Sequence, residues 1–196
     1  MDTKELILLV AKEEFIKKGY DDTSLRDIAK KCHISPTAIY RHFENKEDIF
    51  NEIIRPLFDY FDETTNYIQS TDYKFLNENK PSNVWDFERE GNYYYKFLFG
   101  PYTDLVKLLI KERKSWFKKY IVDFEYDVTI KYLNEMKKNG HNINNFNNIS
   151  FKLLLDSYLE AYINLLDLNL DEDTLKEVCR EINNFYTIGF RNLLGF

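Results

Sequence analysis

The sequence predicts an all-α protein, with a three-helix domain at its N-terminus and a larger helical body behind it. Apolar residues recur at helical spacing along most of the 196 residues. Capping side chains precede several of these stripes, and glycine or proline separates them. A chain of this length buries a sizeable core and suits one domain or two small ones. We place the domain boundary between residues 1–46 and residues 47–196.

The first helix is expected over residues 3–18. Its apolar residues recur at helical spacing, and Gly19 supplies the C-terminal stop. The chain then bends at residues 20–22. Phe15 and Tyr20 are expected to pack beneath the two helices that follow.

Two short helices joined by a tight turn are expected next. Thr23 or Ser24 caps the first of them, and Ser24 with Asp27 approximates a capping box. Ser35 caps the second, and Pro36 occupies its first position, where the missing N–H costs nothing. Two helices joined this tightly are typical of a helix-turn-helix, whose second helix enters the major groove of DNA.

A third motif helix begins at Lys46. Asn45 caps it, and Asp48 lies where a carboxylate favours the positive end of the helix. A lysine at the first position is unfavourable there unless an anion such as a DNA phosphate lies in front of it. The helix is expected to continue to Phe61 with a kink or break at Pro56, which lacks the N–H of a regular helix. That proline is either a hinge or a static kink.

These residues carry a family resemblance. The run SPTAIYRHF at 35–43, followed by NKED at 45–48, resembles the DNA-binding domain of the TetR/AcrR family of bacterial repressors. The run TSLRDIA at 23–29 is similar to the second helix of that domain. The resemblance extends over about residues 4–54, and beyond it only the general architecture is similar. His33 departs from the family pattern, which has glycine in the turn, so we expect a mildly strained turn with positive φ.

The resemblance implies sequence-specific regulation of transcription by binding double-stranded DNA, with repression relieved by a small molecule. Implied phosphate contacts are Thr23, Ser24, Tyr40, His42 and Lys46. Pro36, Thr37 and Ala38 are implied to face base edges, and Ser35 and Arg41 complete the expected DNA-binding set. The competing class is a ligand-binding or interaction module whose helix-turn-helix does not bind an operator. An enzyme is the third class considered.

Charge is distributed unevenly along the chain. The net charge is −6, yet residues 23–46 carry +3, so the remainder carries −9. A small basic footprint on an acidic body suits a protein that binds DNA at one end, although an ordinary helix surface is the alternative.

Several functions and locations lack a signal in the sequence. Cys32 and Cys179 do not form a CxxC motif and indicate ordinary thiols in a reducing compartment. The apolar run Leu6–Ala11 is too short for a signal core or a membrane span, so a cytoplasmic protein without a membrane partner is expected. The three histidines lack metal-ligand spacing, and no catalytic or cofactor motif is present. We therefore expect no catalytic residue, no metal and no cofactor.

The body begins with an irregular and aromatic stretch. The helical pattern decays over residues 64–83, where Asn77, Asn79, Lys80 and Pro81 mark a loop. Gly91 and Gly100-Pro101 interrupt the aromatic run that follows, which predicts two short helices and a turn. Residues 103–138 form a helical stripe with a break expected near 111–114, and Gly140 ends it. Residues 126–132 also alternate as in a strand, but no turn signal bounds them.

Aromatic residues concentrate in this part of the chain: residues 57–126 hold 19 of the 33. They form either a tight core or an apolar pocket for a small, largely apolar ligand. The candidate lining residues are Phe61, Trp85, Tyr94, Phe97, Trp116, Tyr120 and Phe124. Arg89 or Arg113 would meet an acidic group of the ligand.

Two further helices are expected at residues 149–166 and 173–194. They are apolar on more than one side, which predicts a twofold-symmetric homodimer through these helices on a pseudo-palindromic operator. The expected seam residues are Leu154, Tyr158, Tyr162, Ile182, Tyr186, Gly189 and Phe190. Gly189 would permit close approach of a second helix.

Overall fold

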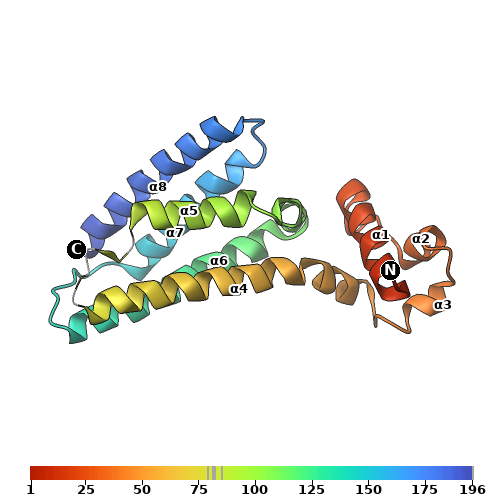
Figure 1. Cartoon of the computed structure of the whole chain (residues 1–196), viewed down its shortest axis with the longest axis horizontal. Coiled ribbons are helices and arrows are strands. Elements are labelled where there is room, and N and C mark those ends of the chain that lie inside the picture. Colours follow the sequence, from red (N-terminus) through yellow and green to blue (C-terminus); the bar gives the residue numbers. More distant parts are fainter. Residues whose placement is uncertain (79, 81–82, 85, 196) are drawn as a thin grey trace. The chain divides into compact units, whose positions relative to one another are not determined.

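The computed structural model describes residues 1–78, 80, 83, 84 and 86–195, and in this part of the chain the fold is all-α, as predicted (Figure 1). The helices are α1 (Thr3–Lys18), α2 (Leu25–Lys31), α3 (Pro36–Ile39), α4 (Lys46–Asn77), α5 (Phe87–Phe99), α6 (Thr103–Lys138), α7 (Asn148–Leu165) and α8 (Glu172–Leu194). The strand considered over residues 126–132 is part of α6. Among the described residues, no helix has the length and apolar character to cross a membrane.

The chain divides into two compact units. The first comprises Met1–Tyr60 and Asp104–Lys114, and the second comprises Phe61–Thr103 and the residues from Ser115 onward. Both α4 and α6 therefore contribute to both units. The division differs from the boundary expected after residue 46, because the beginnings of α4 and α6 make side-chain contacts with the N-terminal helices.

The first unit is built around α1, which has the predicted bounds. Gly19 ends it with φ of 97°, and the Gly19 amide donates to the Phe15 carbonyl at 2.9 Å. The Phe15 ring lies 5.3 Å from that of Tyr20 and 5.9 Å from that of Phe50 on α4. These rings hold α1, the bend after it and the start of α4 together.

The buried Glu14 on α1 was not identified from the sequence. Its side chain is 1% exposed, and it forms ion pairs with Lys18 and Lys31. Hydrogen bonds from these two ammonium groups hold the pKa of the Glu14 carboxyl below its usual value. The carboxylate thus joins α1 to the end of α2.

The helix α4 continues through Pro56, so the structure excludes the break that was one of the two expectations there. It extends through the residues where the apolar pattern decays and ends at Asn77, the first of the residues that mark the expected loop; Asn79 and Pro81 lie outside the described residues. Pro56 is exposed, so the carbonyl that loses its N–H partner can be hydrated. The apolar pattern decays because the buried Thr65 and Asp72 occupy the inward face of the helix. Thr65 is satisfied by the Phe61 carbonyl at 2.8 Å, and Asp72 pairs with Arg89.

The expected interruption at Gly91 is also wrong, because α5 is one helix through that glycine. The glycine instead permits a close approach to α8, which lies beside α5 (Figure 1). A Cβ atom at Gly91 would lie 2.8 Å from Nδ2 of Asn183. Asn183 is fully buried and accepts hydrogen bonds from Tyr158 and Thr187, so it cannot move aside freely.

Replacing Gly91 by valine is expected to lower the free energy of unfolding by about 1–3 kcal/mol, because the side chain would wedge α5 away from α8. Chemical denaturation of the full chain measures this effect. Glu63→Val is the control, because it places the same side chain at an exposed position of α4. Equal stability of the Gly91→Val variant and the wild type would contradict the close packing.

The break expected near residues 111–114 is confirmed. Arg113 has non-helical torsion angles, with φ of −145° and ψ of 37°, between two helical parts of α6. This residue also lies next to the division between the two compact units.

Candidate DNA-binding site

Local hydrogen bonds build the predicted helix-turn-helix. The Ser24 hydroxyl accepts from the Asp27 amide at 3.1 Å, and the Ser35 hydroxyl accepts from the Ala38 amide at 3.2 Å. His33 has φ of 56°, which confirms the expected positive value in the turn. The Ile34 amide then donates to the Ala29 carbonyl at 3.0 Å and closes the turn.

Buried apolar side chains fix which face of α3 is presented outward. Ile28 and Ala29 of α2, Ile39 of α3 and Phe43 behind it are all at most 2% exposed. With these residues held inside, the polar side chains of α3 and its C-terminal end must face outward. Of the predicted DNA-binding residues, the exposed ones are Ser24, Ser35, Pro36, Thr37, Tyr40, Arg41 and His42, while Ala38 is half-buried.

Thr23 and Lys46, also predicted to contact DNA, have partners within the chain. Thr23 is 1% exposed, and its hydroxyl donates to the Gly19 carbonyl at 2.8 Å. The Lys46 ammonium donates to the carbonyls of Tyr20 at 2.6 Å and Thr23 at 3.0 Å, and it lies 4.2 Å from the centre of the Tyr20 ring. These acceptors make a lysine favourable at the first position of α4 without an external anion. Phosphate contacts by Thr23 and Lys46 stay predictions.

A second cluster in the same unit was missed by sequence reasoning. Glu47, on the first turn of α4, accepts a hydrogen bond from the Tyr20 hydroxyl at 2.9 Å and forms an ion pair with Arg113. The Arg113 guanidinium lies 5.0 Å from the centre of the Phe50 ring. Burial, and after it the hydrogen bond to Glu47, raises the pKa of Tyr20 to about 12. The sequence signal near this cluster is the expected break at residues 111–114. The sequence-based prediction for Arg113 is a different one, contact with an acidic group of a ligand.

The predicted ligand-lining residues of the second unit mostly form a packed cluster. Phe61 and Phe97 are at most 1% exposed, and their ring centres lie 5.0 Å apart. Phe124 and Tyr120 lie 4.9 and 6.0 Å from Phe61 by the same measure. Tyr94 and Phe124 line small cavities, and Trp116 is 49% exposed. Trp85 lies outside the described residues.

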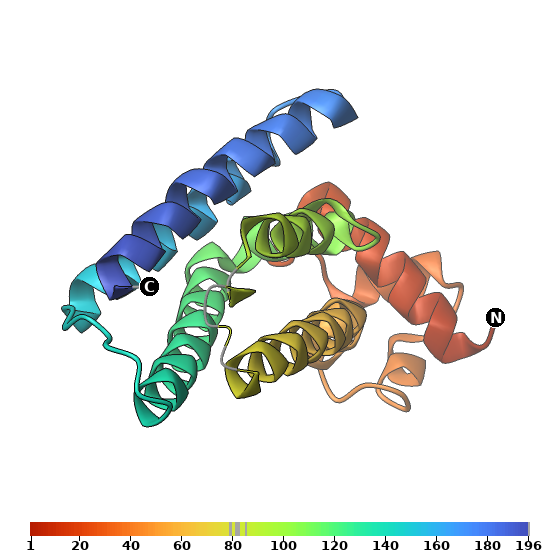
Figure 2. The same ribbon diagram turned by 60° about the vertical axis from the view of Figure 1, so that its left-hand side comes forward.

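The predicted seam residues on α7 and α8 divide between two environments. Tyr158 and Tyr162 are at most 6% exposed within the single chain, and the Tyr162 hydroxyl donates to the Cys179 carbonyl at 3.0 Å. Phe190 is also buried, Ile182 and Tyr186 are half-buried, and Leu154 and Gly189 are exposed. The two helices lie side by side (Figure 2). Large exposed apolar side chains on them are Ile149, Leu153, Leu154, Phe185 and Ile188.

Comparisons with known proteins agree with this geometry. Residues 7–53 match the family model of the bacterial regulatory proteins of the tetR family. The chain is 30% identical over 97 residues to the negative transcriptional regulator IcaR of the icaADBC biofilm operon from Staphylococcus epidermidis, and this match covers 50% of the chain and 46% of that protein. IcaR from Staphylococcus aureus is 37% identical over 71 residues, which is 33% of the chain and 38% of that protein. The matches thus span less than half the length of these relatives.

A solved structure extends the similarity of fold to the body. A TetR-like transcriptional regulator from Rhodococcus superposes with a TM-score of 0.59 at 16% identity, covering 97% of this chain and 95% of that one. The fold of the whole chain is therefore that of such regulators, although this identity is too low to show more than the fold. Residues 7–53 are thus similar to the DNA-binding domain of the tetR family, and the fold of the whole chain is similar to that of a TetR-like regulator.

Proposed function

We propose that this protein is a repressor that binds a pseudo-palindromic DNA operator as a homodimer and is released by a small ligand. The observation that carries the proposal is the outward face of the helix-turn-helix. Tyr40, Arg41 and His42 are exposed at the end of α3, while the buried residues around it hold that helix in a fixed orientation. Phosphate contacts from such side chains position a recognition helix, and contacts to base edges supply the sequence preference. Because such a repressor must reach chromosomal DNA, we propose that the protein acts in the cytoplasm.

The relatives support the direction of regulation. IcaR of both staphylococcal species is named as a negative transcriptional regulator. Residues 7–53, which match the family model, include the residues that we assign to DNA, so we extend repression to this chain. Selection of binding sites from a random DNA pool with the full chain tests the proposal. Recovery of a pseudo-palindromic sequence supports it, and recovery of no preferred sequence would favour an interaction module that does not bind an operator.

The apolar face of α7 and α8 supports the proposed dimer. Phe185 is 73% exposed and Ile188 is 52% exposed, and both flank a surface hollow that includes Gly189. An exposed apolar patch of this kind marks an interaction surface. A second copy related by a twofold axis would cover the patch with the same patch, and the Gly189 position leaves room for its side chains.

Release by a ligand requires that the ligand favour one arrangement of the protein over another. The second unit is the proposed location, because small cavities lie between its helices. Their sizes, about 20 and 40 Å³, are far below those of pockets for drug-sized ligands, so binding of a larger molecule must separate the helices.

Replacing Tyr40 by phenylalanine is expected to weaken binding to the selected operator and to unrelated DNA alike. The exposed hydroxyl would lose a phosphate contact worth about 0.5–1.5 kcal/mol, which is about a two- to tenfold change in Kd. Fluorescence anisotropy with labelled duplexes measures both affinities. Tyr67→Phe, at a tyrosine that is 69% exposed on α4, is the matched control.

The contrasting variant is Thr37→Ala, which should change the preference among operator sequences and leave binding to unrelated DNA unchanged. A uniform loss with Thr37→Ala, or a change of preference with Tyr40→Phe, would reverse the two assignments.

A further inference from the structure

The candidate site surrounds Glu125 on α6. This carboxylate lines both small cavities of the second unit, one of about 20 Å³ and one of about 40 Å³. The larger cavity lies between α5, α6, α7 and α8. Its lining residues are Tyr94, Glu125, Thr129, Phe151, Leu155, Tyr158, Thr187 and Phe190. Glu125 is thus a carboxylate in the lining of a cavity where four of the eight lining residues are aromatic.

The charge of Glu125 lacks a cation among the residues that the structure describes. Two carboxylates that are at most 1% exposed are both paired with cations, Glu14 of the first unit with two lysines and Asp72 of the second unit with Arg89. Glu125 has instead a hydrogen bond with Tyr94, and its side chain is half-buried. Desolvation raises the pKa of its carboxyl to about 7 despite that bond. A desolvated carboxylate without a cationic partner is costly to ionise, and an external cation would lower that cost.

Aromatic rings around the larger cavity would add to the attraction for a cation. The ring of Tyr158 lies 4.9 Å from that of Tyr94 and 6.1 Å from that of Phe190, between centres. Phe151 lies 5.4 Å from Phe190. The faces of such rings attract ammonium groups, most strongly where water is excluded. The hydroxyl oxygens of Thr129 and Thr187 add hydrogen-bond acceptors to the same lining.

We propose that this cavity binds the ammonium group of a slender primary amine, with Glu125 as its counter-ion and the surrounding rings as its aromatic walls. The size of the cavity favours this class of ligand. About 40 Å³ accommodates a group of the size of one or two water molecules, such as an ammonium head with the first carbon of its chain. A quaternary ammonium group would be too bulky unless the helices separated.

This inference rests on the proposed function, because an amine bound between α5 and α8 would be the ligand that releases the protein from its operator. The amine-binding site and its effect on DNA are measured separately. Either can therefore fail without the other.

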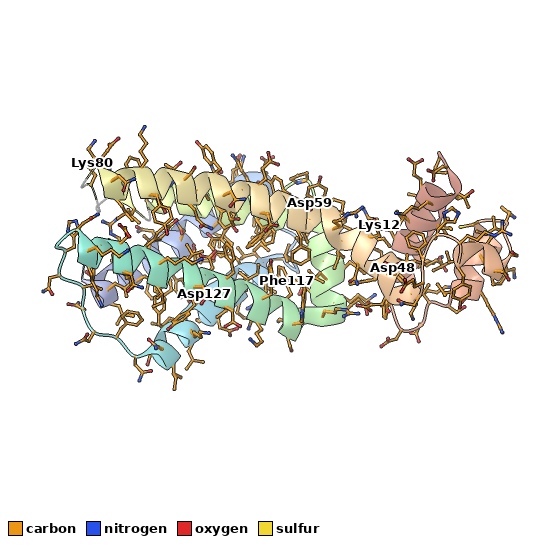
Figure 3. The ribbon with its side chains drawn as sticks, turned by 90° about the horizontal axis from the view of Figure 1, so that it is seen from below. Lys12, Asp48, Asp59, Lys80, Phe117 and Asp127 are labelled. Carbon is orange, nitrogen blue, oxygen red and sulfur yellow. The ribbon has the colours of Figure 1, made fainter. Side chains whose placement is uncertain are left out.

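The binding test uses the full chain and n-butylammonium chloride, with n-butanol as the neutral probe of the same length. A ligand-detected NMR titration at pH 8 is expected to show saturable binding of the amine and much weaker binding of the alcohol. Glu125→Gln should weaken binding of the amine at least tenfold. Asp127→Asn is the matched control, because Asp127 is an exposed carboxylate two residues away on α6 (Figure 3).

A second variant separates the aromatic contribution from the charge. Phe190→Leu keeps an apolar side chain and removes one ring, so it should weaken the amine several-fold and leave the alcohol unchanged. If Glu125→Gln fails to fold, the ratio of amine to alcohol binding by Phe190→Leu tests the site instead. The proposal is overturned if no saturable amine binding occurs, if butanol binds as tightly, or if both variants bind the amine like the wild type.

The regulatory role is read from operator affinity with and without saturating amine. A loss of operator affinity that disappears in Glu125→Gln supports release by the amine. Unchanged operator affinity with bound amine leaves the binding site supported and contradicts its role in release. If no operator is found at all, the proposed repressor function fails, while the amine titration still decides the site.

Discussion

Replacing Phe185 by arginine is expected to convert the proposed dimer into monomers and to weaken operator binding on the order of a hundredfold or more. Twofold symmetry would place both copies of the new charge in the same apolar interface, where an unpaired charge is strongly unfavourable. Binding by one recognition helix instead of two then removes the advantage of joined half-sites. Sedimentation equilibrium and operator anisotropy measure the two effects.

The matched control for this change is Tyr67→Arg, which places the same charge at another exposed aromatic position. It should leave the mass in solution unchanged. A Phe185→Arg variant that remains dimeric would remove the α7–α8 face from the proposal. A wild-type chain that sediments as a monomer at micromolar concentration would contradict the dimer itself.

Replacing Glu125 by glutamine is expected to stabilise the protein at pH 8 by on the order of 2 kcal/mol and to leave its stability unchanged near pH 4. The pKa of this carboxyl is raised from 4.5 to about 7 by burial, so the folded chain holds the proton more tightly than the unfolded chain. Wild-type stability therefore falls as pH rises from about 4.5 to 7, and the deficit is constant above that range. Glutamine carries no charge and avoids the deficit.

Denaturant unfolding of both proteins across this pH range measures the difference between them. The buried Asp72, whose pKa burial raises to about 6 against the effect of Arg89, titrates in the same range. Its contribution is common to both proteins and cancels in the difference. A Glu125→Gln variant that is less stable than the wild type at pH 8 would mean that the carboxylate has a cationic partner.

Local signals made the N-terminal domain predictable from the sequence. Ser24, Ser35 and Pro36 act on residues within one helical turn, so their effects can be recognised without tertiary information. The positive φ of His33 likewise follows from the tight turn. The break near Arg113 was predictable because a straight helix of 36 residues exceeds the needs of a compact domain.

In the body, polar residues on inward helix faces made the extent of the helices harder to predict from the apolar pattern. Thr65 and Asp72 interrupt the apolar stripe of α4, and they are tolerated because Phe61 and Arg89 satisfy them. Gly91 predicted a helix end because glycine is unfavourable inside helices. The close approach of Asn183 offsets that cost, and it joins positions that are distant in the sequence.

The sequence by itself determined the helical class and the capped helix-turn-helix and supplied the candidate residues for DNA contact, since each depends on side chains close together along the chain. Only the tertiary structure decided which of these side chains are free. In that structure, Lys46 donates hydrogen bonds to the carbonyls of Tyr20 and Thr23, and Arg113 forms an ion pair with Glu47. Glu125 has no cationic partner in the described chain. Ion pairs and burial depend on residues that folding brings together from distant positions, and a linear pattern does not record them.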